Sequence, residues 1–202
     1  LTDYTLGIDT PDKMIQKLKE NPWPIYKIKM SSPDEIDTIR QLRTETNALF
    51  RIDANASWKV DDAMLLIPEL KKLGVEFVEQ PLAKDQWDAM QMLKQQSVLP
   101  LYADESCVTE HDVLQCAKSF HGINIKLTKC GGLTPALRMI QQARQMELKV
   151  MMGCMNETEI GSYAMAQFLP LLDAVDMDGP LLLKNAPLHR LAYDQGRVSI
   201  LS

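Results

Sequence analysis

Short apolar runs alternate with longer amphipathic stretches along the whole chain. Eight runs, mostly rich in Ile, Val, Leu, Tyr and Phe and bounded by Pro, Gly or polar residues, are typical of strands buried on both faces. The pattern predicts strands at residues 4–9, 25–30, 49–54, 75–79, 100–104, 122–127, 149–154 and 174–178. The amphipathic stretches between them are typical of helices. This alternation predicts consecutive βα units and a parallel sheet.

Two of the amphipathic stretches carry signals for the start of a helix. Ser32-x-x-Glu35 is a capping-box pattern. Thr134 is expected to be the N-cap of the stretch TPALRMIQQARQME. Pro68 lies inside the stretch DDAMLLIPELKKLG, so we expect that helix to be kinked or to start late.

Ionisable residues close most of the predicted strands. They are Asp9, Lys29, Asp53, Glu79, Asp104, Lys126 and Asp178. From Lys29 to Lys126, successive members are between 22 and 26 residues apart, which is about the length of one βα unit. Active sites of (β/α)8 barrels lie at the C-terminal ends of the strands, and buried charges there need a partner or a metal. The sequence therefore predicts a (β/α)8-type barrel, in (β/α)7β form, with a reaction centre at its mouth.

An open doubly wound sheet is the main alternative for alternating βα units. Such a sheet usually has a glycine-rich turn after its first strand, whereas Asp9-Thr10-Pro11 stands there in this chain. Functional groups on most of the eight strands also favour closure. We expect the barrel to span residues 1–180 and residues 181–202 to form an apolar, strand-like tail.

Composition narrows the class of protein. The 202 residues lie at the short end of the barrel range, and 46% of them are hydrophobic, as in ordinary globular proteins. A net charge of −5 argues against a nucleic-acid surface. No apolar run approaches a membrane span, and no signal peptide is visible. Four scattered cysteines suit a reducing compartment, so we expect a cytoplasmic protein.

Three of the strand-end groups are carboxylates on neighbouring strands. Asp53, Glu79 and Asp104 follow predicted strands three, four and five. One such carboxylate alone would be interpreted as a helix cap or a member of a salt bridge. Three that converge would repel one another without a cation, and hard oxygen ligands with open positions suit Mg²⁺. The sequence therefore predicts a magnesium site.

Lysines occupy two other strand ends. Lys29 and Lys126 are four strands apart in an eight-stranded ring, so they are expected to face each other across the mouth. Lys27 lies on the same side of its strand as Lys29. A neighbouring ammonium and a divalent ion both lower the pKa of a lysine, as a lysine base requires. The alternative is that these lysines only neutralise the acids. Two opposed bases would instead suit racemisation or epimerisation next to a carboxylate.

The groups lie within longer motifs that cover nearly the whole chain in order. They are Lys27-Ile28-Lys29, Asp53-Ala54-Asn55, Glu79-Gln80-Pro81, Ala103-Asp104-Glu105-Ser106 and Ile125-Lys126-Leu127-Thr128-Lys129-Cys130-Gly131-Gly132. With these motifs the chain resembles the enolase superfamily, in its muconate-lactonising subgroup. That superfamily is a known example of a Lys or His base acting with Mg²⁺ through an enediolate.

The resemblance implies specific roles for the matching residues. Asp53, Glu79 and Asp104 would bind one Mg²⁺, and Lys29 and Lys126 would be the two acid/base groups. Lys27 would contact the substrate carboxylate, whereas Lys129 is given no catalytic role. The subgroup also contains o-succinylbenzoate synthases, N-acylamino acid racemases and cycloisomerases, so these residues alone do not fix the reaction.

Asp176-Met177-Asp178 distinguishes among these reactions. Residues i and i+2 of a strand point to one face, where two carboxylates could hold an α-ammonium. With Cys154 and Met155 after strand seven, this pair resembles that of the dipeptide epimerases, which implies that these four residues bind substrate. An anionic succinyl group would be repelled there. The alternative is that the two aspartates form a solvated turn.

The resemblance implies Mg²⁺-dependent epimerisation of a dipeptide of the L-Ala-D/L-Glu type, in recycling of cell-wall peptides. The alternatives are an o-succinylbenzoate synthase or N-acylamino acid racemase, and a catalytically silent barrel that binds a metal and a ligand. Members of this family also have an N-terminal capping domain, which we expect to be absent before Leu1. The tail at 181–202 would pack on that domain. Homo-oligomers are a further expectation; nucleic-acid and membrane partners are not.

Overall fold

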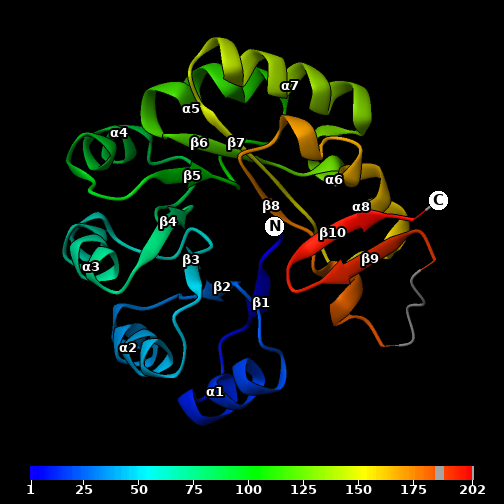
Figure 1. Ribbon diagram of the computed structural model, residues 1–202. Coiled ribbons are helices and arrows are strands. Elements are labelled where there is room, and N and C mark those ends of the chain that lie inside the picture. The colour runs from blue at the N-terminus through cyan, green and yellow to red at the C-terminus, as the bar shows by residue number, and fades with distance from the viewer. Residues whose placement is uncertain (185–188, 202) are drawn as a thin grey trace.

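The computed structural model describes residues 1–184 and 189–201 and forms an eight-stranded barrel (Figure 1). Its strands pair in parallel, and their order in the sheet is their order in the chain. They are β1 (Tyr4–Leu6), β2 (Ile25–Lys29), β3 (Leu49–Asp53), β4 (Val75–Glu79), β5 (Leu101–Ala103), β6 (Gly122–Ile125), β7 (Lys149–Gly153) and β8 (Ala174–Asp176). All eight predicted strands are present, although β1, β6 and β8 end two or three residues earlier than predicted.

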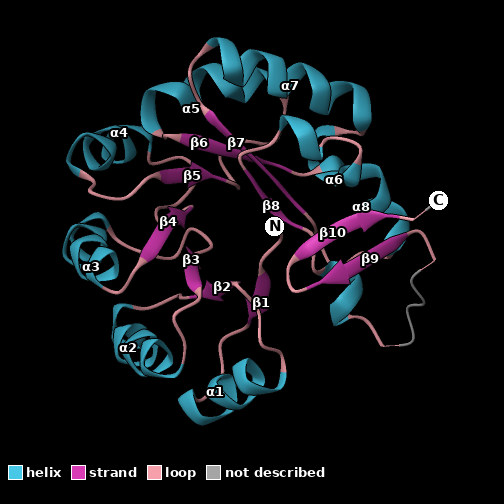
Figure 2. Ribbon diagram, in the orientation of Figure 1, coloured by secondary structure: helices cyan, strands magenta, loops and turns pink. Residues whose placement is uncertain are grey.

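Helices connect successive strands on the outside of the barrel (Figure 2). They are α1 (Pro11–Glu20), α2 (Ile36–Glu45), α3 (Val60–Lys72), α4 (Trp87–Gln96), α5 (Val113–Ser119), α6 (Leu127–Cys130), α7 (Leu133–Gln145) and α8 (Glu159–Ala166). Short 3₁₀ turns add η1 (Pro33–Glu35), η2 (Glu110–Asp112), η3 (Leu169–Leu171) and η4 (Gly179–Leu182). Each long helix buries its apolar face against the sheet, as the periodicity predicts.

Two of the expected helix starts differ from the structure. The Ser32–Glu35 capping box is confirmed, but the N-cap of α7 is Gly132 rather than Thr134. Gly132 has a φ of 117°, a conformation that favours glycine, and this lets α7 begin immediately after the short helix α6. Pro68 does not delay its helix: α3 begins at Val60 and continues through the proline.

The expected strand-end position of Asp9 is also wrong. Strand β1 ends at Leu6, and the exposed Asp9 accepts a hydrogen bond from the Thr10 amide and pairs with Lys13 at 3.1 Å. This is a local interaction at the start of α1, where an acidic side chain is favourable. Asp9 therefore does not belong to the groups at the barrel mouth.

The barrel closes where its first and last strands meet. Thr2 and Val175 form a parallel bridge between the two ends of the sheet. Beside it, the Met177 amide donates to Oγ1 of Thr2 at 2.7 Å, and the Thr5 amide donates to Oδ2 of Asp178 at 2.6 Å. Side chains therefore hold much of this seam, whereas regular ladders join the other strands.

Large and small side chains are complementary inside the barrel. Phe77, Tyr102, Met151 and Ala174 form a small interior cluster, and the guanidinium of Arg51 lies 5.2 Å from the centre of the Phe77 ring. A Cβ at Gly122 would lie only 2.6 Å from the Tyr102 ring, so the glycine makes room for it. The interior is a packed core, as in other barrels of this type.

The described part of the tail forms a hairpin of β9 (Leu191–Asp194) and β10 (Arg197–Ile200). It packs on the barrel near the seam: the Thr2 amide donates to the Gly196 carbonyl at 2.7 Å, and the Tyr193 hydroxyl donates to the Met177 carbonyl at 2.9 Å. Residues 185–188 and 202 of the predicted tail lie outside the described residues. Packing against a capping domain stays a prediction.

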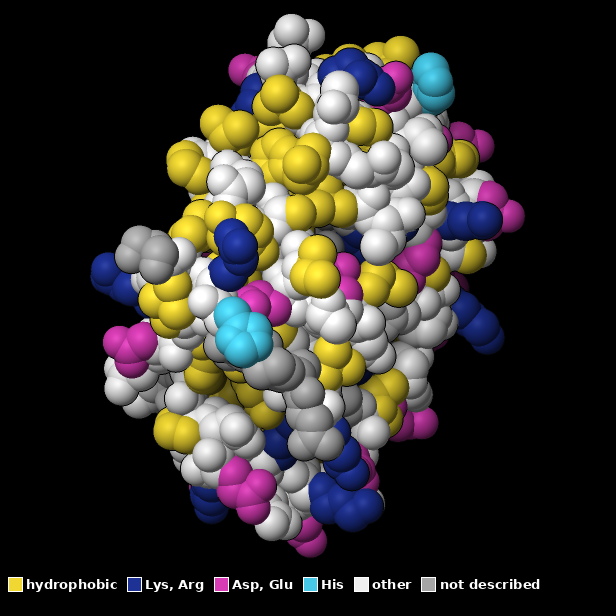
Figure 3. Space-filling model, turned by 90° about the vertical axis from the view of Figure 1, so that its right-hand side faces the viewer, with side chains coloured by type: hydrophobic (Ala, Val, Ile, Leu, Met, Phe, Trp, Pro, Cys, Tyr) yellow, Lys and Arg dark blue, Asp and Glu magenta, His cyan; other side chains and the backbone are white. Residues whose placement is uncertain are grey.

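Figure 3 views the side of the molecule that carries this hairpin and α8. Hydrophobic side chains gather in the upper part of this face, among scattered charged ones. On α8 itself, Ile160 is 82% exposed. Within residues 1–184 and 189–201, no helix has both the length and the apolar character that a membrane crossing demands.

Candidate active site

The sheet register brings the predicted site residues to the mouth of the barrel. Lys29 pairs with Asp53 between β2 and β3, and Asp53 pairs with Glu79 between β3 and β4. Asp104 and Lys126 follow the last residues of β5 and β6. The parallel strands thus place five groups, distant in sequence, at one end of the barrel.

The three carboxylates predicted to bind a metal lie together. One oxygen from each of Asp53, Glu79 and Asp104 lies within 4.8 Å of the others, and all three residues are buried. Three hard oxygen donors at this spacing, beside a cleft that could supply water and substrate ligands, fit the coordination preference of Mg²⁺.

The negative charge of Glu79 is only partly balanced by its neighbours. Its Oε1 accepts a hydrogen bond from Nδ2 of Asn124 at 2.7 Å, whereas its buried Oε2 lies 2.9 Å from Nζ of Lys27 without hydrogen-bond geometry. Burial, and then the charge of Asp53, raises the pKa of Glu79 to about 8. A divalent ion would stabilise the charged carboxylate. The donor set and this electrostatic demand therefore both fit a metal.

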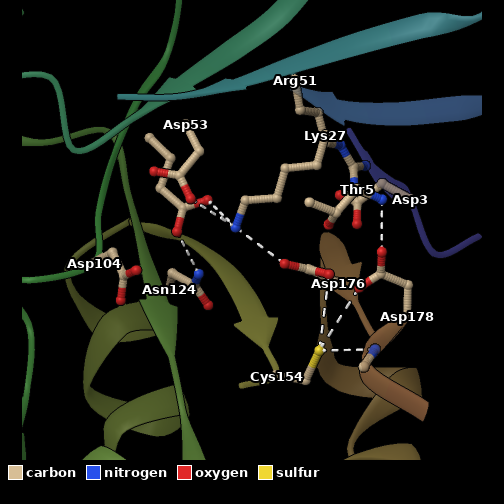
Figure 4. Close-up of polar contacts among 12 residues, drawn as sticks. Asp3, Thr5, Lys27, Arg51, Asp53, Asp104, Asn124, Cys154, Asp176 and Asp178 are labelled. Carbon is tan, nitrogen blue, oxygen red and sulfur yellow. Dashed lines mark hydrogen bonds and ion pairs between the residues drawn. The ribbon is translucent and has the colours of Figure 1, made fainter. Parts of the chain in front are cut away.

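Lys27 lies at the centre of the charge network (Figure 4). Its Nζ is 3.0 Å from Oδ2 of Asp53, 2.9 Å from Oε2 of Glu79 and 3.0 Å from Oδ2 of Asp176. Burial alone would lower its pKa, but the three carboxylates, Asp176 first, outweigh burial and raise it. Lys27 is therefore a fixed internal cation, and only 3% of its side chain is exposed.

The two predicted acid/base lysines come from opposite sides of the ring. Nζ of Lys29 donates to Oδ2 of Asp53 at 2.6 Å and to Oδ1 of Asn55 at 2.9 Å. Nζ of Lys126 donates to Oδ2 of Asp104 at 2.7 Å. Strands β2 and β6, from which they project, are four positions apart in the eight-stranded order.

The electrostatics of Lys126 differ from expectation in this structure. Burial favours the neutral amine, but the charge of Asp104 outweighs it, so the pKa of Lys126 is raised and not lowered. Asp104 also accepts from Nζ of Lys129. Burial would raise the pKa of Asp104, yet Lys129 and then Lys126 hold it well below its usual range. The Asp104 carboxylate is thus firmly ionised.

A second acidic cluster lies across the mouth on β7 and β8. Sγ of Cys154 is 3.9 Å from Oδ1 of both Asp176 and Asp178, and the Gly179 amide donates to that sulfur at 3.3 Å. Figure 4 shows the two carboxylates and the sulfur converging, with Asp178 tied to Thr5 of β1. Exposed Met155 lines the adjoining cleft.

The two aspartates are 4% and 2% exposed, so their interpretation as a solvated turn is wrong. They also differ in charge balance. Burial would raise the pKa of Asp176, but Lys27 outweighs it and lowers that pKa. Burial and then the charge of Asp176 raise the pKa of Asp178 to about 7. Among the described residues Asp178 has no cationic partner, so its ionised form would be stabilised by a cation bound on this side of the mouth.

Three polar residues behind the site were not predicted. Asn124 donates to Glu79, and Nη1 of Arg51 donates to Oδ2 of Asp3 at 2.9 Å beneath Asp176. Asn124 and Arg51 stand two residues before Lys126 and Asp53, so the two-residue repeat of a strand was an available signal. Asp3 had no such signal, because it precedes β1 and reaches the site only through the seam.

One cleft joins the two clusters. Among the residues that line it are Lys29, Lys126, Asp176, Asp178 and Leu182. The predicted lysines, metal ligands and aspartates, with Cys154 and Met155, are therefore brought together at one mouth. Their roles in catalysis and binding are not fixed by this placement.

Comparison with known proteins agrees with this geometry. Residues 12–197 match the family described as enolase C-terminal domain-like. An L-Ala-D/L-amino acid epimerase of Maribacter sp. is 57% identical over 183 residues, covering 91% of this chain and 54% of that protein. The chain thus spans about half the length of this curated relative.

Two solved structures superpose on nearly the whole chain. The substrate-liganded L-Ala-D/L-Glu epimerase from Bacillus subtilis has a TM-score of 0.93 at 29% identity, covering 99% of this chain and 60% of that one. The dipeptide epimerase from Cytophaga hutchinsonii, complexed with Mg and D-Ala-L-Val, has a TM-score of 0.92 at 29% identity, with coverages of 98% and 58%. The chain belongs to the enolase C-terminal domain-like family.

Proposed function

We propose that this chain carries the catalytic site of a dipeptide epimerase, an isomerase of the L-Ala-D/L-Glu type. The observation that supports this most is one cleft lined by two lysines from opposite strands and by a buried aspartate pair with surplus negative charge. The named activities of the Maribacter and Bacillus proteins point the same way.

Lys29 and Lys126 exchange the proton in this proposal. The neutral amine of one takes the α-proton of the C-terminal residue, which leaves an enediolate, and the ammonium of the other returns a proton to the opposite face. No group is oxidised or reduced, and the two lysines end with their protonation states exchanged. Lysine bases of this kind require a nearby charge that favours the neutral amine.

Asp53, Glu79 and Asp104 would hold one Mg²⁺. When bound, the ion supplies positive charge for the negative charge that develops on the substrate carboxylate. The charge of Asp104 raises the pKa of Lys126, and a divalent ion bound by Asp104 would offset that charge and favour the neutral amine. Lys27 would remain beside Asp53 and Glu79 as a permanent positive charge near the substrate carboxylate.

Asp176 and Asp178 would bind the free α-ammonium at the other end of the dipeptide, with Cys154 and Met155 beside it. A charged ammonium satisfies a buried carboxylate that lacks a cation. An N-acylated or succinylated substrate has no cation to place there. The surplus negative charge therefore favours dipeptides over the substrates of N-acylamino acid racemases and o-succinylbenzoate synthases.

The test is deuterium uptake at the α-carbon. The chain is incubated with Mg²⁺ and a dipeptide library that includes L-Ala-L-Glu in D₂O, and the products are identified by mass spectrometry. We expect uptake into dipeptides, and none with Lys29→Ala or Lys126→Ala. Lys149→Ala is the matched control, since this lysine lies on the outer surface.

The same assay is repeated with the remaining sequence of the Maribacter relative joined to this chain. Uptake only in the joined protein supports the site and shows that substrate closure needs the added sequence. Uptake into N-acylated amino acids but not into dipeptides would contradict the proposal. Dipeptide binding without uptake in either protein would favour a catalytically silent barrel.

A further inference from the structure

Gln80 follows the metal-ligand residue Glu79 directly and has an unusual backbone. Its φ of 37° lies in the left-handed region, which is uncommon for a residue with a side chain. Its side chain is fully buried. A strained, buried amide beside a ligand position is held there by the structure around it.

The Gln80 amide links two loops at the mouth. Its Oε1 accepts hydrogen bonds from the backbone amides of Asp104 at 3.0 Å and Ser106 at 3.1 Å. Its Nε2 donates to the carbonyl of Leu82 and to Oγ of Ser106, both at 2.8 Å. Both hydrogens and both lone pairs of the amide are therefore used.

Asp104 needs such support because it lies outside the sheet. Strand β5 ends at Ala103, so Asp104 follows the last residue of the ladder. The Gln80 side chain accepts from its amide, and Nζ of Lys129 donates to its carbonyl. The backbone amide of Gln80 also donates to the Tyr102 carbonyl, at 2.8 Å. The two loops are thus fixed to each other by one residue.

We propose that Gln80 is a positioning residue that holds the Asp104 carboxylate at the distance from Glu79 that the metal site requires. This inference rests on the metal role in the proposed function. Only a side chain of this length that donates and accepts at once satisfies all four partners. Removing it releases the loop at Asp104 while all three carboxylates stay in the chain.

The test compares variants that remove different parts of this linkage. Gln80→Asn keeps an amide and tolerates a positive φ, but it is one methylene too short to keep the contact with Asp104. Gln80→Met keeps the length without the hydrogen bonds. Ser106→Ala removes one partner of Nε2 and leaves the acceptor for Asp104 in place. Leu93→Ala creates a cavity under α4 and controls for lost stability.

Mg²⁺ affinity is measured by isothermal titration calorimetry. Residues that orient metal ligands typically change the dissociation constant by about 10- to 100-fold when removed. We expect that loss for Gln80→Asn and Gln80→Met, and a change of less than about threefold for Ser106→Ala and Leu93→Ala. Equal loss in Leu93→Ala at a matched drop in Tm would show a general effect of stability and overturn the positioning role.

Hydrogen exchange of the metal-free chain gives a second readout. The Asp104 and Ser106 amides should exchange faster in Gln80→Asn and stay protected in Leu93→Ala. Wild-type Mg²⁺ affinity in a folded Gln80→Asn variant overturns the inference alone, whatever the exchange rates. A wild-type chain that binds no Mg²⁺ instead overturns the metal assignment of the proposed function, and the inference fails with it.

Discussion

Two groups of buried carboxylates share the barrel mouth, and their charge is balanced differently. Asp53 and Asp104 each pair with two lysines, and Glu79 lies beside Lys27. On β8, Asp176 shares that same Lys27, and the described contacts of Asp178 are with an amide, a thiol and its fellow aspartate. In the first group, lysines occupy the positions where a metal would bind. In the second group, Asp178 has no cationic partner among the described residues, as expected of a site for a cationic ligand.

We expect the largest effect from a substitution that changes only the first group of carboxylates. Glu79→Gln removes one charged ligand, so we expect Mg²⁺ affinity to fall by about 100-fold or more and α-proton exchange by about 10³-fold. Calorimetry and the deuterium assay measure the two. Glu76→Gln is the matched control, because this glutamate on β4 pairs with Arg51 away from the mouth. Unchanged Mg²⁺ binding in Glu79→Gln would contradict the metal assignment.

Asp178→Asn breaks the second group and leaves the first intact. It keeps the side-chain shape and the acceptor for the Thr5 amide but removes the charge. We expect kcat/KM for dipeptides to fall by about 10- to 100-fold, the cost of losing a buried charge-assisted contact, with Mg²⁺ affinity unchanged. A variant that turns over dipeptides as well as the wild type would remove the ammonium role from this residue.

The raised pKa of Asp178 predicts how stability depends on pH. Folded Asp178 holds its proton up to about pH 7, against 3.8 for an ordinary aspartate. Its contribution is therefore present at low pH and lost as pH rises from about 4 to 7. Between pH 5 and 8 the wild type should lose on the order of 2 kcal/mol relative to Asp178→Asn. Urea unfolding of both proteins measures this, and parallel pH profiles would refute it.

The smallest expected effect is on dipeptide binding. Affinity should increase as pH rises, whereas stability should decrease. Ionised Asp178 attracts an ammonium and protonated Asp178 does not, so dipeptide affinity should rise about tenfold from pH 5.5 to 7.5. The Lys126→Ala variant allows the dissociation constant to be measured without turnover. The rise should be absent when Asp178→Asn is added. A rise that survives in this double variant would come from another group.

The groups at the strand ends were predictable because strand period and βα spacing act over short distances. Lys29, Asp53, Glu79 and Lys126 lie where these two repeats place them. Asp9 was wrongly included, because β1 ends at Leu6 and Asp9 instead contacts Thr10 and Lys13 at the start of α1. The pattern of apolar and polar residues does not reveal such contacts at the start of a helix.

Residues whose roles depend on tertiary contacts were not predictable. Gln80 stands in a recognised motif, but its bonds to Asp104 and Ser106 depend on a left-handed backbone and on the meeting of two loops. Asp3 reaches Arg51 only because the barrel closes. The N-cap at Gly132 likewise depends on how α6 ends. The contacts of these residues depend on strand register and backbone conformation, which the sequence pattern alone does not specify.

Because the barrel closes between β8 and β1, the two groups of carboxylates at the mouth are completed at different stages of synthesis. The three carboxylates proposed to bind the metal all precede β6, so they are translated before β7 and β8. Asp178 follows all three of them in the chain and is anchored to Thr5, which precedes them. Under the proposed function, a chain that stops before β8 contains the metal ligands but lacks the aspartates that would bind the ammonium. The proposed ammonium contact would arise only in chains that are translated through β8 and closed at the seam.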